Sequence, residues 1–519
     1  MRPERLARPA LESLEPSLWI DEAIWGHRLY DEQIPWLAFL EMLGVLRAEA
    51  AAGRAFQEPN GLNKLRYESR HLLYLRNIVF NNPRLATILL QVPDDAARWD
   101  QWRTAMRETT SGIKDPNYEY VSTRFNSFED FALLVQLLRS TAIEGDTNKR
   151  WTSKFVFPYG PSCLYEDLRL EDGLRASNDR RFFARAGELV YLMLCRSGRS
   201  AELYSLLQPL LLAPDARWNR LVAVLEPPGS SERQREPSSS PYLPYANHDD
   251  FRDLAEDWLA LLKTGLPGYD VLPHLVDILG LHLILYFLRR ASEWSPRPVP
   301  VRLVVEIVAP KRSTVRDLAS ESFQQNSLLS KQAVTSFIDE ELASSVDWHA
   351  ACGSTDPFGR ALEVAYQKVG WKALRRGGED YDGQRSPEGI LEGLRGAAEK
   401  RHAQHLAGFH ASYARAIGLA SRRGTRRVRY APSDQLLKSL VLTLVPTRME
   451  FQQFLQLLWT RYGLIIGHRQ AGAYIGPESD QKSFEENARR LEMRLGSLGL
   501  LHRLSDACAY VANPFGGDR

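Results

Sequence analysis

The segment from Ala431 to Phe515 constrains the fold of this chain more than any other part. It predicts, in order, two helices, a short apolar segment, an amphipathic helix and a pair of short β segments. Ser433 can cap the first helix, Thr447 with Glu450 three residues later would form a capping box for the second, and Gly463 would end that second helix. This succession is typical of a winged helix, a module that binds DNA or a protein partner.

The third helix of this module, residues 482–499, would enter the major groove of DNA. Phe484 and Leu491 mark its apolar face, and its arginines fall on other faces. Basic side chains of such a helix and of the wing bind phosphates. We therefore predict DNA contacts from four arginines, namely Arg489, Arg490, Arg494 and Arg503.

An arginine-rich arm precedes the module and contains no acidic residue. Such an arm can add contacts to the DNA backbone or minor groove. The residues predicted to make these contacts are Arg422, Arg423, Arg426, Arg427 and Arg429. Two alternatives stay open, because a basic run is often only a solvated loop and many winged helices join protein subunits. In the second case Phe484 and Leu491 would dock the partner, and Glu485, Glu486 and Glu492 partly cancel the basic charge.

The composition is that of an ordinary globular protein, with 44% hydrophobic and 25% charged residues. At 519 residues the chain is too long for one core, and about two to four domains are expected. The formal net charge is only +2, so affinity for nucleic acid must come from local patches. The cysteines are far apart and form no CxxC pair, which argues against a zinc site or a disulfide framework.

Helical patterns dominate the remaining chain, so we predict a mainly α, multi-domain helical array with a small β element and a C-terminal winged helix. Val299–Pro310 is the one credible strand region, and the apolar stretch Leu275–Leu288 indicates a buried core helix rather than a membrane span. No signal peptide is found, so a cytoplasmic protein without membrane contact is expected. The predicted divisions are a helical domain (1–225), a linker or mobile loop (226–247), a middle helical domain (248–387), a long helix with the basic arm (388–430) and the winged helix (431–519).

No catalytic, metal or cofactor site emerges from the motifs. Glu399 and His402 have the Glu-x-x-His spacing of di-iron proteins, but no matching pair is present and a core histidine is the better interpretation. Glu306 and Lys311 lack the spacing of a metal-dependent nuclease, so we expect Glu306 to be a buried acid paired with an arginine. An enzyme assembled from distant residues stays open as a weaker alternative.

A second candidate site is the segment 144–168, where basic and aromatic residues alternate in a predicted loop. Such a loop could hold a single strand or a phosphate-bearing ligand, although its aromatic residues could equally seal the first domain. The residues singled out are Asn148, Lys149, Arg150, Trp151 and Lys154.

Three phrases of the sequence resemble helix-rich accessory proteins of multi-gene bacterial DNA-defence clusters. They are RLYDEQIPWLAFLE (Arg28–Glu41), NKRWTSKFVFPYGPSCLYEDL (Asn148–Leu168) and RLSDACAYVANPF (Arg503–Phe515). The resemblance implies a subunit that works beside an ATPase, a nuclease or a modification enzyme in restricting foreign DNA. It adds to the residue-based hypothesis of a non-enzymatic, DNA-contacting subunit, for which a protein scaffold without nucleic acid is the alternative.

Overall fold

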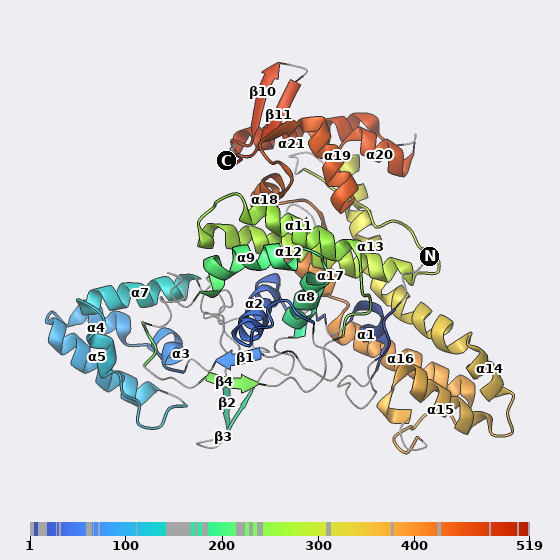
Figure 1. The fold of residues 1–519 in the computed structure, drawn as a ribbon, viewed down its shortest axis with the longest axis horizontal. Helices are drawn as coiled ribbons and strands as arrows, with labels where there is room; N and C mark the ends of the chain where they lie inside the picture. Colours follow the sequence, from blue (N-terminus) through green and yellow to red (C-terminus); the bar gives the residue numbers. More distant parts are fainter. Residues whose placement is uncertain are drawn as a thin grey trace. The chain divides into compact units, whose positions relative to one another are not determined.

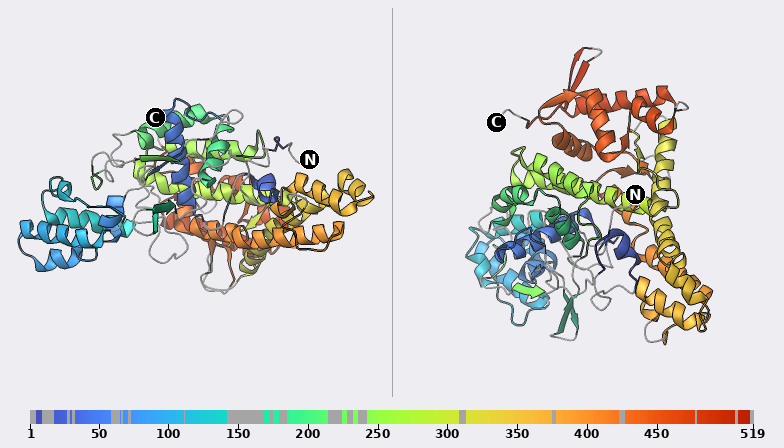
Figure 2. Two further views of the ribbon diagram at one scale, coloured as in Figure 1. Left: turned by 90° about the horizontal axis from the view of Figure 1, so that it is seen from below. Right: turned by 45° about the vertical axis from the view of Figure 1, so that its right-hand side comes forward.

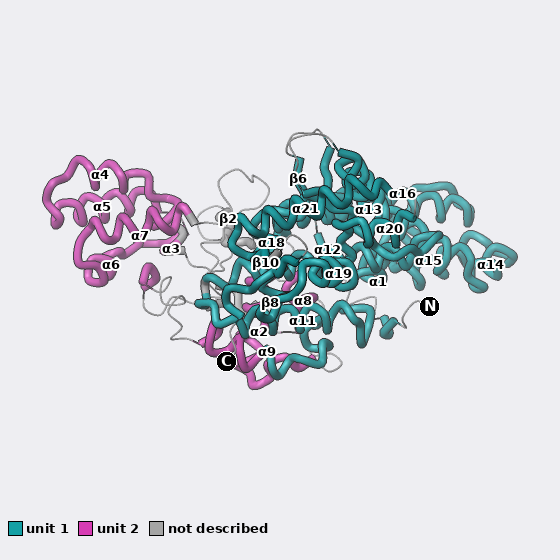
Figure 3. The backbone as a smooth tube through the Cα atoms, turned by 90° about the horizontal axis from the view of Figure 1, so that it is seen from above, with its two compact units in different colours: residues 1–35, 192–203, 238–519 teal, residues 36–191, 204–237 magenta. Residues whose placement is uncertain are grey.

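The structure is a computed structural model, and it separates into two compact units (Figure 3). Unit 1 comprises residues 1–35, 192–203 and 238–519, and unit 2 comprises residues 36–191 and 204–237. The described residues are 5–8, 18–26, 29–30, 33–58, 65, 67–70, 73–110, 112–141, 168–171, 175–178, 185–213, 224–227, 232–235, 242–307, 313–374, 378–422, 427–476, 479–505 and 508–516.

Unit 2 is built mainly from helices around an aromatic core. Trp99 and Trp102 lie edge to face against Phe128, and Trp102 is fully buried. The elements are α2 (Pro35–Ala51), β1 (Tyr67–Arg70), α3 (Leu73–Phe80), α4 (Leu85–Gln91), α5 (Asp95–Thr109), α6 (Glu119–Ser122), α7 (Phe128–Thr141), β2 (Leu168–Glu171), β3 (Arg175–Asn178), the π-helix η3 (Gln208–Leu212) and β4 (Glu232–Arg235). β1 pairs with β4 and β2 pairs with β3, both antiparallel. Two helices run across the boundary between the units, α8 (Arg185–Cys195) and α9 (Ser200–Leu207).

The centre of unit 1 is the long helix α12 (Gly268–Glu293), which is apolar on nearly all sides and therefore buried. It packs against α11 (Asp249–Leu262), α13 (Thr314–Ile338), α17 (Phe409–Ala416) and α18 (Asp434–Leu444). Among the described residues, Asp270–Glu293 is the segment long and apolar enough to cross a membrane, but 89% of its apolar window is buried inside the protein. That is the setting of a core helix, as the sequence predicted for Leu275–Leu288.

A helical layer extends from the centre of unit 1 (Figure 1). Its elements are α1 (Ile20–Trp25), η4 (Asp339–Ala343), α14 (Val346–Cys352), α15 (Pro357–Val369), η5 (Lys372–Leu374) and α16 (Pro387–His405). Ser386 caps α16 and Pro387 occupies its first turn. The long helix predicted within 388–430 is interrupted, since α16 ends at His405 and α17 begins at Phe409.

The C-terminal module, residues 431–516, contains four helices and three strands of one sheet. After α18 come β8 (Arg448–Glu450), α19 (Phe451–Tyr462), β9 (Leu464–Ile465), α20 (His468–Ile475), α21 (Gln481–Ser497), β10 (Leu501–Ser505) and β11 (Cys508–Ala512). The sheet order is β10-β11-β8, with both pairs antiparallel. Figures 1 and 2 show the β10–β11 hairpin extending away from α19–α21.

Several local predictions for this module are confirmed and one is wrong. Ser433 caps α18 by accepting from the Leu436 N–H, and Gly463 ends α19 in the left-handed conformation at φ 74°. The capping box of Thr447 and Glu450 does not form, because the chain there is strand β8 and α19 begins only at Phe451.

The described part of the middle strand region contributes β5 (Leu303–Val304), which pairs in parallel with β9 of the C-terminal module. Helices therefore dominate the described residues and the β elements are small, as the sequence predicted for the fold class. The predicted domain boundaries stay predictions.

Candidate nucleic-acid interface

The arginine-rich arm forms the connection of a two-stranded hairpin. β6 (Ala420–Ser421) pairs antiparallel with β7 (Arg429–Tyr430), so residues 422–428 connect the two strands and Arg429 begins β7. Arg422 and Arg427 are exposed. Arg423 and Arg426 lie outside the described residues. The hairpin thus presents arginines in a short connection that holds no acid.

Arg429 does not belong to the exposed set. Its side chain is 0% exposed and donates to Glu306, which is also 0% exposed. Arg316 donates to the other carboxylate oxygen of Glu306 at 2.8 Å. A guanidinium in this position reaches a phosphate only by breaking a buried ion pair, so the prediction of DNA contact by Arg429 is wrong.

A hydrogen-bond chain holds the base of the hairpin in unit 1. The Glu306 N–H donates to the Tyr430 carbonyl at 3.0 Å, and Asn326 Nδ2 donates to the Tyr430 hydroxyl at 2.9 Å. That hydroxyl is therefore placed to donate to His410 Nε2 at 2.8 Å. Burial lowers the pKa of His410 to about 3, which agrees with a neutral ring that accepts at Nε2. The hairpin base is consequently fixed, whatever the arm contacts.

The four arginines predicted on the third helix and wing all have acidic partners. Arg489 and Arg490 both pair with Glu486 within one turn of α21. The Arg494 guanidinium donates to Asp434 at 2.6 Å, and Arg503 donates to Glu492 at 2.7 Å. Arg489 and Arg503 nevertheless remain 64% and 51% exposed. Exposed pairs of this kind contribute about 0–1 kcal/mol, so the carboxylates hold these exposed arginines only weakly.

Asn487 fixes α21 against the paired strands β5 and β9. Its amide nitrogen donates to the carbonyls of Val305 and Ile466 at 2.9 and 3.0 Å, and its oxygen accepts from the Ile307 N–H at 2.8 Å. Three buried backbone groups are thereby satisfied by one side chain. The sequence offered no signal for this role, because its partners are remote along the chain.

The residues proposed for docking a protein partner are not at the surface. Phe484 and Leu491 are both 0% exposed, and Phe484 packs in a core cluster with Val304 and Val315. Their use as a docking face is therefore wrong. Met493 on α21 is instead 60% exposed.

Two predictions about isolated polar residues are confirmed. Glu306 is a buried acid paired with arginines, as its position in an apolar strand region indicated. His402 is a buried core histidine, with its Nε2 2.9 Å from the Ser330 hydroxyl. Among the described residues there is no group of three or more His, Cys, Asp or Glu side chains that could hold a metal ion.

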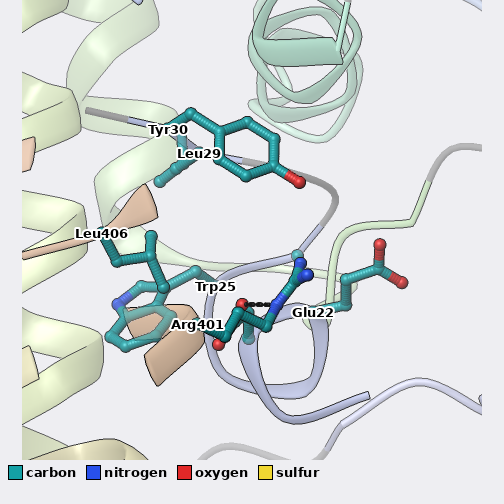
Figure 4. Close-up of a pocket in the computed structure, with 8 residues that line it drawn as sticks. Glu22, Trp25, Leu29, Tyr30, Arg401 and Leu406 are labelled. Atoms are coloured by element: carbon teal, nitrogen blue, oxygen red, sulfur yellow. Dashed lines mark hydrogen bonds and ion pairs between the residues drawn. The ribbon is translucent and has the colours of Figure 1, made fainter. Parts of the chain in front are cut away.

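A small cavity in unit 1 lies between α1 and α16 (Figure 4). Trp25, Tyr30 and Leu406 line it, and Arg401 donates to Asp21 at its edge at 2.5 Å. Its volume of about 10 Å³ has room for roughly one water molecule, so the cavity is too small for an organic substrate.

A larger polar cluster escaped the sequence analysis. Asp257 is 4% exposed and accepts from Arg461 Nη2 at 2.6 Å, from the Tyr462 hydroxyl at 2.7 Å and from His282 Nε2 at 2.7 Å. Burial alone would raise the pKa of Asp257, but His282 and Arg461 hold it below its ordinary value. The cluster joins α11, α12 and α19. The second predicted site, with Asn148, Lys149, Arg150, Trp151 and Lys154, lies outside the described residues.

Helical layers, an arginine-bearing hairpin and a small antiparallel sheet define a mainly α protein. Over residues 388–512 the chain matches the family model described as methylation-associated defense system protein MAD7. The matched segment runs from α16 to β11 and includes the hairpin. The resemblance to proteins of bacterial DNA-defence clusters is thereby confirmed. Neither a curated protein nor a solved structure matches the chain.

Proposed function

We propose that the chain is a non-enzymatic, DNA-contacting subunit of a bacterial phage-defence complex. The arginine hairpin is the observation that carries the proposal. Its base is anchored by the buried Glu306–Arg429 pair, and its exposed Arg422 and Arg427 belong to a connection free of acid. Such a group of cations suits a phosphate backbone. The family match of residues 388–512 supports work in a defence system.

We also infer a winged-helix arrangement for the C-terminal module. α18, α19 and α21 would be its three helices, and β10 with β11 would be the wing. β8 lies between α18 and α19 in sequence and would be the third strand of the sheet. In such a module the third helix faces DNA. Arg494 of α21 contacts Pro432 and Asp434, just beyond β7, so α21 and the hairpin base are neighbours. Helix and hairpin would then contact one stretch of duplex.

Replacing the four hairpin arginines outside the buried pair should abolish salt-sensitive retention of DNA. The variant carries alanine at 422, 423, 426 and 427 and keeps Arg429. For every phosphate that the variant no longer neutralises, the slope of log affinity against log salt should fall by about 0.9. Fluorescence anisotropy with a labelled duplex at several salt concentrations measures both the affinity and this slope.

A control variant separates this effect from a general loss of charge. Alanine at Arg84, Arg107, Arg252 and Arg360 removes four exposed cations elsewhere on the chain. We expect the control to bind DNA as the wild-type protein does. Equal binding by the hairpin variant and the wild-type protein would reject the proposal.

Replacing Glu486 by glutamine should strengthen DNA binding. The change releases Arg489 and Arg490 and removes a negative charge from the face of α21 that would meet the phosphates. The gain should be at most about 5-fold, because an exposed pair is worth at most about 1 kcal/mol. Glu363→Gln, which breaks the exposed Arg360–Glu363 pair on α15, is the matched control and should change nothing.

The Glu486→Gln experiment also tests a second role for α21. Met493 and Leu504 are 60% and 70% exposed, which favours docking of a protein of the same defence system on this helix and wing. Unchanged DNA affinity of the Glu486→Gln variant would assign α21 to that role and leave the hairpin as the DNA contact. A partner ATPase or nuclease would supply the chemistry, and the cytoplasm would be the site of action.

A further inference from the structure

Residues 5–8 form no helix or strand and pack against other parts of unit 1 while staying partly exposed. The Leu6 N–H donates to the Pro244 carbonyl at 2.7 Å, and the Tyr242 hydroxyl donates to the Leu6 carbonyl at 3.1 Å. Both the N–H and the carbonyl of Leu6 are therefore hydrogen-bonded, and these two bonds hold the segment in place. The Leu6 side chain is 38% exposed, so its identity matters little for this contact.

Arg5 occupies an aromatic pocket with an acid at its rim. Its guanidinium lies 5.1 Å from the ring centre of Trp294 and 5.6 Å from that of Phe337. Its Nη2 donates to Glu341 at 2.5 Å. Arginine suits such a pocket because its planar cation stacks on aromatic faces and bonds a carboxylate at the same time.

Arg8 occupies a second pocket, at the C-terminal end of α15. Its Nη1 donates to the carbonyls of Gln367 and Lys368, at 3.1 Å for Lys368, and its guanidinium lies 4.8 Å from the ring centre of Trp19. The negative end of the helix dipole favours a cation there. Burial lowers the pKa of Arg8 to about 10, although the charge of Glu22 opposes the shift.

We propose that this groove is a docking site for an extended peptide of another protein that carries two arginines three residues apart. Residues 5–8 occupy it in this structure as an internal ligand of the same chemistry. We call the surface formed by Trp19, Tyr242, Trp294, Phe337, Glu341 and the end of α15 the arginine groove. It binds two cationic side chains and the main chain between them, which is how extended peptides are commonly recognised.

The internal segment fills the arginine groove incompletely, and this makes it replaceable. Arg8 Nε and Nη2 are buried, yet neither finds a hydrogen-bond partner among the described residues. The Arg5 and Glu341 side chains remain 27% and 35% exposed, so water competes for their ion pair. A peptide that satisfies the Arg8 pocket better can therefore displace residues 5–8.

A full-length variant that weakens its own segment tests the proposal. Arg5→Glu with Arg8→Glu leaves every residue of the arginine groove in place. The probe is a labelled peptide with the sequence of residues 1–10, MRPERLARPA. We expect this variant to bind the probe at least 10-fold more tightly than the wild-type protein, because a filled groove lowers the apparent affinity.

Three further measurements make the test specific. A shuffled peptide with its arginines adjacent should not bind, since the two pockets need arginines three residues apart. Adding Glu341→Lys to the double variant should remove binding of the probe. Arg5→Ala alone should give a smaller gain in affinity, and it carries the test if circular dichroism shows that the double variant does not fold.

Failure of the double and single variants to bind the probe would overturn the proposal, and so would equal binding of the ordered and shuffled peptides. A wild-type dimer in light scattering would assign the groove to exchange of residues 5–8 between two copies, which also overturns docking of another protein. None of these readouts involves DNA, so their outcome is independent of the proposed DNA contact.

Discussion

Replacing Glu306 by alanine should lower the free energy of unfolding by about 3–5 kcal/mol. The carboxylate is 0% exposed and accepts from Arg429, also 0% exposed, and from Arg316, which is 13% exposed. Without it a buried guanidinium keeps its charge and loses its counter-charge. Chemical unfolding followed by tryptophan fluorescence measures the change as a lower denaturant midpoint.

Two comparisons separate the buried charge from a general weakening of the packing. Lys331→Ala removes one partner of the exposed Lys331–Glu399 pair and should cost less than about 1 kcal/mol. Adding Arg429→Met to Glu306→Ala should restore part of the missing stability, because it removes the unpaired charge. A Glu306→Ala protein as stable as the Lys331→Ala protein would contradict this account.

The Glu306→Ala substitution should also loosen the hairpin and weaken its proposed DNA contact. Arg429 lies at the end of the arm, and Tyr430 joins the same network through Asn326 and His410. A released hairpin base would no longer hold the exposed arginines in one place. Weaker DNA binding by Glu306→Ala is therefore expected even though Glu306 itself contacts no phosphate, which makes it a positioning residue in the proposed function.

Local signals in the sequence were sufficient for several elements of the C-terminal module. Ser433 before an apolar helix and Gly463 after one act on their own neighbours, and in the structure α18 begins after Ser433 and α19 ends at Gly463, as predicted. The Thr447–Glu450 pair carried an equally good local signal and failed. Glu450 pairs with Tyr510 in the sheet, and this non-local contact outweighed the capping box.

The same difference between local and non-local contacts explains which features of the candidate site could be predicted. Glu486 lies three and four residues before Arg489 and Arg490, so partial cancellation of their charge was visible in the sequence. The burial of Arg429 was not visible, because Glu306 lies 123 positions away. Likewise the partners of Asp257 on α19 lie more than 200 positions along the chain. Periodicity assigns residues to helix faces, but it does not say which remote acid a basic residue will meet.

Glu226 provides a comparable case in unit 2, at the start of the segment that the sequence marked as a linker. Leu225 is 0% exposed and Glu226 is 6% exposed, so the chain is packed at this point. One carboxylate oxygen accepts from the Leu75 N–H at 2.8 Å, and the other has no hydrogen-bond partner among the described residues. Burial raises the pKa of this carboxyl from 4.5 to about 7, although the Leu75 N–H opposes the shift.

Replacing Glu226 by glutamine should therefore stabilise the protein above neutral pH and not in acid. A carboxyl whose folded pKa is raised adds stability that is complete below pH 4.5 and is lost as the pH rises through about 7. The difference between the two pKa values corresponds to about 3 kcal/mol. Glutamine mimics the protonated carboxyl at every pH, so the variant should exceed the wild-type protein by about that amount at pH 8.

Urea unfolding of both proteins between pH 4.5 and 8 measures this difference. The two stability curves should converge near the acid end and separate through neutrality, with the wild-type curve falling. Glu129→Gln, an exposed acid on α7 of the same unit, is the control and should follow the wild-type curve. Equal stabilities of the Glu226→Gln and wild-type proteins at pH 8 would mean that the carboxylate is solvated in the folded protein. The burial described for Glu226 would then be wrong.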